Sequence, residues 1–233
     1  VINTCSFIQD SIQESIDTVL DAVELKKQGK LKAVIVAGCL VQRFKDGLVK
    51  ELPEVDGFVG VDGFGDIETV AQRVLEQGWR LGQASRQLVQ VRRHPASMYQ
   101  GQPDRVAFTA PHYAYLKVSE GCLKGCSFCV IPKIKGPLAS RPLEDLVEEA
   151  KRLIGDRGVK ELIVVGQDTS DYGRDLYGAS RLAPLLDQLA QVDGLRWIRL
   201  LYCHPKGVTD ELIEVLASRP TICKYLDMAV EHS

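Results

Sequence analysis

Short apolar segments alternate with amphipathic helical patterns along the chain, and no other feature of the sequence restricts the fold as strongly. Strands are expected over the ranges 31–37, 57–61, 113–119, 161–166, 196–203 and 225–231. Helical patterns separate most of these segments. Strands that are joined through helices pair in parallel, and the helices then cover the faces of the sheet. The sequence therefore predicts an α/β protein built on parallel sheets.

Helix signals are clear in both halves of the chain. Ser11-Ile-Gln-Glu14 has the pattern of a capping box and predicts that a helix begins there, with Gly29 at its end. Five apolar residues fall on one face of this helix: Ile12, Ile16, Val19, Leu20 and Val23. Further helices are expected at 44–52, 66–78, 142–155 (with Pro142 as the first helical residue), 182–192 and 209–218.

The segment 85–111 differs from its surroundings because it contains three prolines and lacks helical periodicity over most of its length. We expect it to link an N-terminal parallel-sheet domain at 1–84 to a second domain at 112–233, with one short strand near 87–91. Four strands in the second domain are too few for a closed eight-fold barrel, which uses ~250 residues, so a partial, truncated barrel is expected. Both ends of the sequence read as core strands, which predicts a fragment of a longer chain.

Composition narrows the class of protein. The net charge of −2 gives no strong nucleic-acid signature, and there is no apolar run of about 18 residues to cross a membrane. The N-terminus does not read as a signal peptide. Seven cysteines, an odd number without an export signal, favour reduced thiols or metal ligands over a disulfide framework. A cytoplasmic protein is expected.

Three cysteines follow the strand at 113–119 with the spacing C-x3-C-x2-C: Cys122, Cys126 and Cys129. Three thiolates at this spacing can converge on one soft metal centre, and Gly121 and Gly125 allow the loop to bend around it. No fourth Cys or His is nearby, so one metal position would remain open for a small molecule. The alternatives are a zinc site completed by the distant His204, or thiols without a metal.

Other polar groups are expected at the ends of strands, where ligands of parallel sheets gather. Gly166-Gln167-Asp168, Cys203-His204 and Glu231-His232 follow strands of the second domain, while Cys5 and Cys39 follow strands of the first. Asp168 could instead cap a turn, and Cys5 and Cys39 could be core thiols. Cys203 and Cys223 are interpreted as core thiols and His204 as a loop residue.

The cysteine motif resembles the signature of the radical S-adenosylmethionine (SAM) enzymes, in which an aromatic residue, here Phe128, precedes the third cysteine. The surrounding stretches Val118-Ser-Glu-Gly-Cys122, Cys129-Val-Ile-Pro132 and Ser140-Arg-Pro142 are similar to the methylthiotransferase branch of that family. Asn3-Thr-Cys-Ser6 and Gly38-Cys-Leu-x-Gln42 resemble its N-terminal domain. The resemblance implies a six-stranded partial barrel, of which four strands are present.

The resemblance also implies the cofactors. Cys122, Cys126 and Cys129 would hold a [4Fe–4S] cluster that binds SAM, with Phe128 near the adenine. Gly166, Gln167 and Asp168 would bind the methionyl end of SAM, and His232 would lie in the same pocket. Cys5 and Cys39 would be the second and third ligands of an auxiliary [4Fe–4S] cluster, whose first ligand precedes this sequence. Glu231, where the family usually has Gln, would add a negative charge beside the SAM pocket.

Finally, the resemblance implies an activity and partners. Reductive cleavage of SAM would give a radical that takes hydrogen from the β-carbon of an aspartate in small-subunit ribosomal protein number twelve, and a methylthio group would be added there. The stretch 166–178 favours this acceptor over an adenosine of tRNA, the alternative within the family. An electron donor of the flavodoxin or ferredoxin type would be needed. The other reading is an iron–sulfur-binding fragment without activity.

Overall fold

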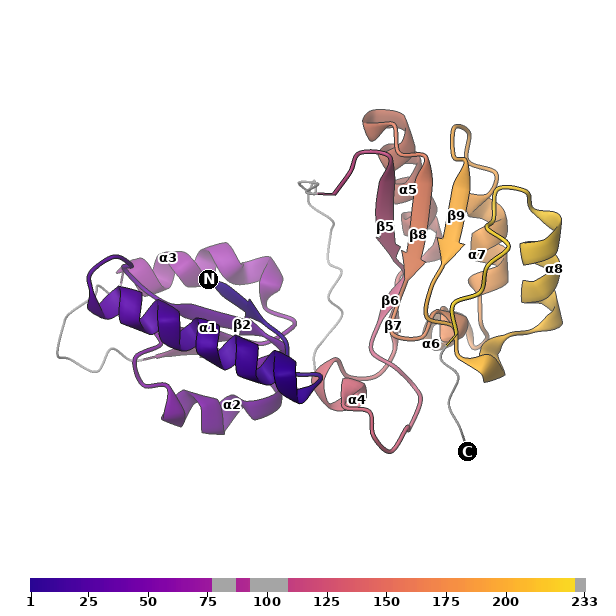
Figure 1. Cartoon of the computed structure of the whole chain (residues 1–233). Helices are drawn as coiled ribbons and strands as arrows, with labels where there is room; N and C mark the ends of the chain where they lie inside the picture. The colour runs from indigo at the N-terminus through magenta and orange to yellow at the C-terminus, as the bar shows by residue number, and fades with distance from the viewer. Residues whose placement is uncertain (77–86, 93–108, 229–233) are drawn as a thin grey trace. The chain divides into compact units, whose positions relative to one another are not determined.

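A computed structural model describes residues 1–76, 87–92 and 109–228 of the chain (Figure 1). These residues form two compact units. The first contains the described residues up to 92 together with 125–136, and the second contains 109–124 together with 137–228. Each unit is an α/β structure, as the alternation of strand and helix patterns predicts.

The first unit is built on a parallel sheet with the strand order β1-β2-β3-β4. Its strands are β1 Ile2–Thr4, β2 Ile35–Gly38, β3 Gly57–Val59 and β4 Leu88–Gln90. Its helices are α1 Gln9–Lys27, α2 Cys39–Glu51, the 3-10 turn η1 Phe64–Asp66, α3 Ile67–Glu76 and the short α4 Ile131–Ile134. The strand expected near 87–91 is β4, which pairs with β3.

Alternating side chains of β2 and β3 divide the core of this unit into two layers. Val36 and Phe58 pack with residues of α1 and α2 in one cluster. Ile35, Ala37 and Val59 pack with α3 in another. Since successive side chains of a strand point to opposite faces, the helices cover both faces of the sheet (Figure 1).

The start of α1 differs from the expected one. The helix begins at Gln9, two residues before the expected start. Ser11 is the third residue of the helix, and its hydroxyl bonds to the backbone of Ile8, the residue before the helix, instead of capping the helix from outside. Ser11 Oγ donates to the carbonyl of Ile8 (2.8 Å) and accepts from its N–H (3.3 Å). The expected inward position of Leu20 was also wrong, since its side chain is exposed. Gly29 has a positive φ of 73° just beyond the helix, as expected of a terminating glycine.

The start of α2 also differs. The sequence pattern predicted a helix at 44–52, whereas α2 begins at Cys39, immediately after β2. Gly38, with φ 105°, lets the chain turn from strand to helix without an intervening loop. The helix is interrupted at Lys45, whose φ and ψ are not helical, so the predicted segment corresponds to the part after this kink.

The second unit contains a parallel sheet with the order β5-β8-β9 and a short antiparallel pair, β6-β7. Its strands are β5 Tyr113–Lys117, β6 Ser119–Glu120, β7 Ala139–Ser140, β8 Glu161–Val165 and β9 Trp197–Leu200. Its helices are α5 Leu143–Arg157, η2 Thr169–Asp171, α6 Arg174–Tyr177, α7 Leu182–Leu189, η3 Pro205–Gly207 and α8 Asp210–Ser218. Leu116, Leu162 and Ile198 of the sheet pack against α5, α7 and α8 in one core (Figure 1).

Two expectations for this unit need correction. Pro142 is the residue before α5 and not its first residue, and the helix passes the expected end at Gly155 to close at Gly158, whose φ is 68°. The fourth strand expected at 225–231 is reduced, up to residue 228, to one bridge between Cys203 and Met228. The end of that segment, with Glu231 and His232, lies outside the described residues.

Candidate functional site

The loops that follow the strands of the second sheet begin at one edge. Lys117 of β5 is paired with Val165 of β8, and Val164 with Leu200 of β9, so the three parallel strands end side by side. The chain leaves β6 through Gly121, with φ 72°, and reaches Cys122. Gly166-Gln167-Asp168 follows β8 directly. The expected placement of Gly166-Gln167-Asp168 at the carboxyl edge of the parallel sheet is confirmed, whereas Cys122 follows a strand of the antiparallel pair.

The loop after β8 packs closely on β6. Gln167 Nε2 donates to Glu120 Oε2 at 3.1 Å, and Glu120, which is almost completely buried, also pairs with Lys117. At Gly166 an added Cβ would lie 3.0 Å from Ser119 Oγ, closer than nine in ten such contacts. Gly166 therefore serves a close approach between the two strand ends.

Asp168 has the capping role that the sequence left open as an alternative. Its Oδ1 accepts from the N–H of Ser170 at 3.0 Å and from the Ser170 hydroxyl, and it begins η2. Its Oδ2 lies 3.6 Å from Lys124 Nζ. Lys124 Nζ is also 2.7 Å from Asp171 Oδ2. Burial alone would lower the pKa of Lys124, but the hydrogen bond and the charge of Asp171 outweigh it and raise that pKa.

Several buried polar atoms at this edge have no hydrogen-bond partner among the residues that the structure describes. They are Ser119 Oγ, Gln167 Oε1 and Asp168 Oδ2, the last of which has Lys124 Nζ beyond hydrogen-bond distance at 3.6 Å. Buried polar atoms are normally satisfied, and an unsatisfied group needs an explanation such as a ligand or water. A small polar ligand that brings both donors and acceptors would satisfy these atoms, which is the chemistry of an aminoacyl group.

The cysteine loop has the donor set that an iron–sulfur cluster needs. All three side chains are thiols outside any disulfide and are partly exposed. Backbone N–H groups donate to two of them: Lys124 N to Cys122 Sγ at 3.3 Å, and Ile131 N to Cys129 Sγ at 3.5 Å. Such N–H···S bonds stabilise thiolates and tune cluster potentials. Phe128, beside Cys129, is 70% exposed.

The three thiols of the motif are divided between the two compact units. Across the described ranges 1–76, 87–92 and 109–228, no group of three or more Cys, His, Asp or Glu side chains could hold a metal ion. Cys122 belongs to the second unit, and the segment 125–136 with Cys126 and Cys129 to the first. The donor chemistry fits a cluster, and the role of the three residues stays a prediction.

Cys5 and Cys39 follow paired residues at the edge of the first sheet. Thr4 of β1 is in register with Gly38 of β2, so both thiols come directly after the last paired positions. The hydroxyl of Ser15 holds the backbone of Cys5 on both sides, at 3.1 Å from its N and 3.0 Å from its O. The N–H of Phe7 is the main cause that lowers the pKa of the Cys5 thiol. Because Cys5 is exposed, the core-thiol alternative is wrong for it.

The remaining residues behave more simply. Cys203 is buried, and burial raises the pKa of its thiol, as expected for a core residue, whereas Cys223 is half-buried. His204 accepts from the N–H of Lys206 at the start of η3. Glu120 and Lys124 also belong to this edge, although neither was predicted from the sequence. Their position between β5 and Cys126, within the cysteine motif, is the sequence signal that could have indicated their role.

Comparison with known proteins identifies the class. The model of the radical SAM superfamily matches residues 116–233, and a model described as "Uncharacterized protein family UPF0004" matches residues 1–60. The chain belongs to the radical SAM superfamily, and the resemblance stated from the sequence is confirmed.

Particular relatives are named as well. The chain is 42% identical to ribosomal protein uS12 methylthiotransferase RimO of Clostridioides difficile and 46% identical to RimO of Citrifermentans bemidjiense. Each match covers 100% of this chain and 50% of the relative, so the chain spans about half the length of these curated relatives.

A solved structure supports the fold alone. The radical SAM methyltransferase TsrM from Kitasatospora setae, with tryptophan substrate and a SAM analogue bound, superposes with a TM-score of 0.62 at 17% identity. The match covers 95% of this chain and 45% of that one.

In the described residues no helix is long and apolar enough to cross a membrane.

Proposed function

We propose that this chain provides the cluster-binding and SAM-binding parts of a methylthiotransferase that modifies an aspartate of ribosomal protein uS12. The observation that carries the proposal is the 42–46% identity along the whole chain to relatives named RimO. The thiols that follow strands in both units support it. All seven cysteines are thiols outside any disulfide, which also supports a reducing, cytoplasmic location.

Cys122, Cys126 and Cys129 would hold the SAM-binding [4Fe–4S] cluster, and Cys5 and Cys39 would contribute to an auxiliary cluster. When bound and reduced by a flavodoxin- or ferredoxin-type donor, the first cluster supplies the electron that cleaves SAM. The backbone N–H groups of Lys124 and Ile131 would stabilise the thiolates of Cys122 and Cys129.

Residues of the loop after β8 would bind and orient SAM. Gln167 Oε1 and Asp168 Oδ2 are buried acceptors that receive no hydrogen bond from the described residues, although Lys124 Nζ lies 3.6 Å from Asp168 Oδ2; such acceptors suit the α-amino group of a methionyl ligand. Gly166 allows the ligand to approach the backbone. Phe128 is exposed and available to stack on the adenine, and His232 would complete the pocket.

The experiment is an anaerobic assay with cluster-reconstituted protein, dithionite and SAM. Replacing Cys126 with Ala should abolish both iron binding at the loop and release of 5′-deoxyadenosine, because two thiolates are a poor cluster site. Cys223→Ala, which removes a half-buried thiol outside the motif, is the matched control and should keep the parent rate. Release at the parent rate from the Cys126→Ala protein would contradict the assignment.

The acceptor is tested separately with uS12 and with tRNA as candidate substrates, by mass spectrometry of each product. We expect a methylthio group on an aspartate of uS12. Methylthio product on an adenosine of tRNA instead would contradict the proposed acceptor, and cleavage of SAM without any transfer would indicate the inactive fragment.

A further inference from the structure

Lys124 lies between the first two cysteines of the motif and makes contacts through both its backbone N–H and its side-chain ammonium group. Its backbone N–H donates to Cys122 Sγ at 3.3 Å. Its ammonium group lies 2.7 Å from Asp171 Oδ2 and 3.6 Å from Asp168 Oδ2, both in the segment after β8. One residue therefore connects the first predicted cluster ligand to the loop predicted to bind SAM.

The two carboxylates make this contact more than a surface ion pair. Asp168 and Asp171 are 3% and 2% exposed, whereas the Lys124 side chain is 26% exposed. A buried carboxylate is costly unless a cation and hydrogen bonds compensate it. Asp171 has a second cation, Arg174, whose Nε lies 2.7 Å from Oδ1. For Asp168, the compensating cation in the described part of the chain is Lys124, whose Nζ lies 3.6 Å from Oδ2.

The backbone around Lys124 needs such an anchor. Gly121 precedes the loop in a left-handed conformation, and Gly125 follows Lys124 directly, with nothing within 4 Å of an added Cβ. Glycines on both sides give the backbone many accessible conformations. Fixing the side chain of Lys124 on the β8 loop restricts the direction of its own N–H.

We infer that Lys124 is a positioning residue: its ion pair with Asp168 and Asp171 fixes the first turn of the cysteine loop and aims its N–H at the Cys122 thiolate. This inference rests on the proposed function for its purpose, because hydrogen bonds to thiolate sulfur raise the reduction potential of a cluster. The contacts themselves lie within the second unit.

The test uses amide hydrogen exchange of the full, iron-free chain, so that it does not depend on a loaded cluster. In the Lys124→Met protein, peptides covering 121–126 and 169–174 should both exchange roughly tenfold faster than in the parent, because both loops lose the shared anchor. Protection of the β8 and β9 amides should stay at the parent level and reports that the unit is folded.

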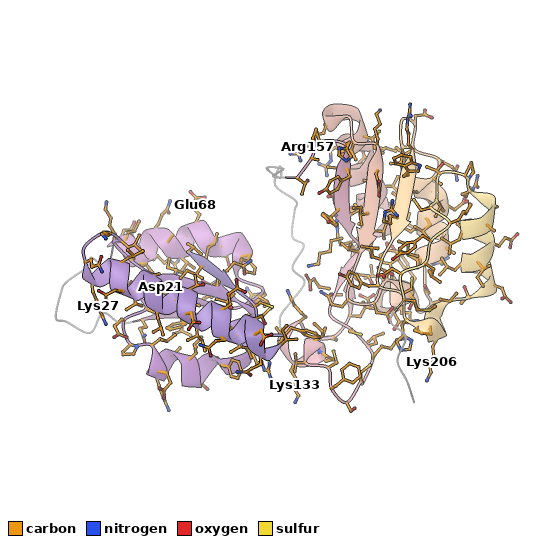
Figure 2. All side chains as sticks on the ribbon, viewed as in Figure 1. Asp21, Lys27, Glu68, Lys133, Arg157 and Lys206 are labelled. Carbon is orange, nitrogen blue, oxygen red and sulfur yellow. The ribbon has the colours of Figure 1, made fainter. Side chains whose placement is uncertain are left out.

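Three further variants assign the effect to the ion pair. Lys124→Arg, which keeps the charge, should retain most of the protection. Asp171→Asn should accelerate the same two peptides. Lys133→Met removes an exposed lysine of α4, in the segment 125–136 of the first unit (Figure 2), and should leave the exchange of both peptides unchanged. Parent-like exchange in Lys124→Met or Asp171→Asn, an Arg variant as fast as Met, or equal acceleration in Lys133→Met would each overturn the inference.

A second measurement addresses the sulfur. In cluster-loaded protein, Lys124→Met should shift the midpoint potential to more negative values than the parent and the Lys133→Met control, since a disordered N–H···S bond stabilises the reduced cluster less. An unchanged potential would overturn the part of the inference that concerns Cys122. Absence of SAM cleavage in the parent would contradict the proposed function while leaving the exchange result standing.

Discussion

Arg141 and Glu149 form a buried ion pair in the second unit. Arg141 Nη1 lies 2.6 Å from Glu149 Oε2, and both side chains are 5% exposed. The same guanidinium donates to the carbonyl of Lys117 at 3.1 Å, at the end of β5. The hydroxyl of Tyr172 donates to the carbonyl of Arg141 at 2.9 Å, and burial is the main cause that raises the pKa of that hydroxyl. One residue thus holds α5, β5 and the β8 loop together.

Removing one partner of this ion pair should lower the stability of the protein. Arg141→Met leaves the Glu149 carboxylate buried without its partner, and we expect a loss of about 3–5 kcal/mol of stability. The double variant Arg141→Met, Glu149→Leu should recover most of it, because no buried charge remains. Exchange of the β5 and β8 amides measures the change. A double variant no more stable than Arg141→Met would contradict the electrostatic explanation.

At the scale of elements, the turn from β2 into α2 decides where Cys39 lies. Gly38 has φ 105°, and a Cβ there would lie 2.7 Å from both Asn3 Oδ1 and the carbonyl of Thr4. Gly38→Ala should therefore force β1 and β2 apart at the end that carries Cys5 and Cys39. We expect the free energy of unfolding to fall by about 1–3 kcal/mol.

A matched control exists in the same helix. Gly47 of α2 has open space around an added Cβ, so Gly47→Ala should be neutral or stabilise the helix by up to about 1 kcal/mol. Thermal unfolding monitored by circular dichroism compares the two variants. Equal stability of the Gly38→Ala and Gly47→Ala proteins would show that the close approach at Gly38 is not strained by a side chain.

The alternation of short apolar segments with helical patterns was sufficient to predict the parallel sheets. All four residues of β2 are buried, and β8 is buried at alternate positions, so both strands stand out as short apolar segments in the sequence. Details that depend on long-range contacts could not be predicted. The start of α2 depends on Gly38 packing against β1, and the β6-β7 pair joins segments too short to carry a periodic pattern. Lys124 belongs to the site through partners far along the chain, and its local sequence contains no sign of them.

For the whole molecule, each compact unit fixes part of the predicted sites by contacts of its own. Cys5 and Cys39 lie in the first unit and follow strands of its sheet. Of the three-cysteine loop, Cys126 and Cys129 also belong to the first unit, whereas Cys122 and the Gly166–Asp168 loop belong to the second. The contacts that position Cys5, from Ser15 and Phe7, are made within the first unit. The contacts that position Cys122, through Lys124, are made within the second.

Because the family resemblance assigns the two sets of thiols to different clusters, we expect that the two sites can be disabled independently. Cys5→Ala and Cys39→Ala should leave release of 5′-deoxyadenosine within about twofold of the parent while abolishing methylthio transfer, because SAM cleavage needs only the cluster of the three-cysteine loop. The iron content per chain is measured after anaerobic reconstitution. If the auxiliary site fills in the parent, the iron content should fall from about eight irons in the parent to about four in the variants; if the auxiliary site does not fill, it should be about four in both. In either case the Cys223→Ala protein should match the parent. Loss of SAM cleavage in both variants, with circular dichroism showing an intact fold, would mean that the two sets of thiols serve one site.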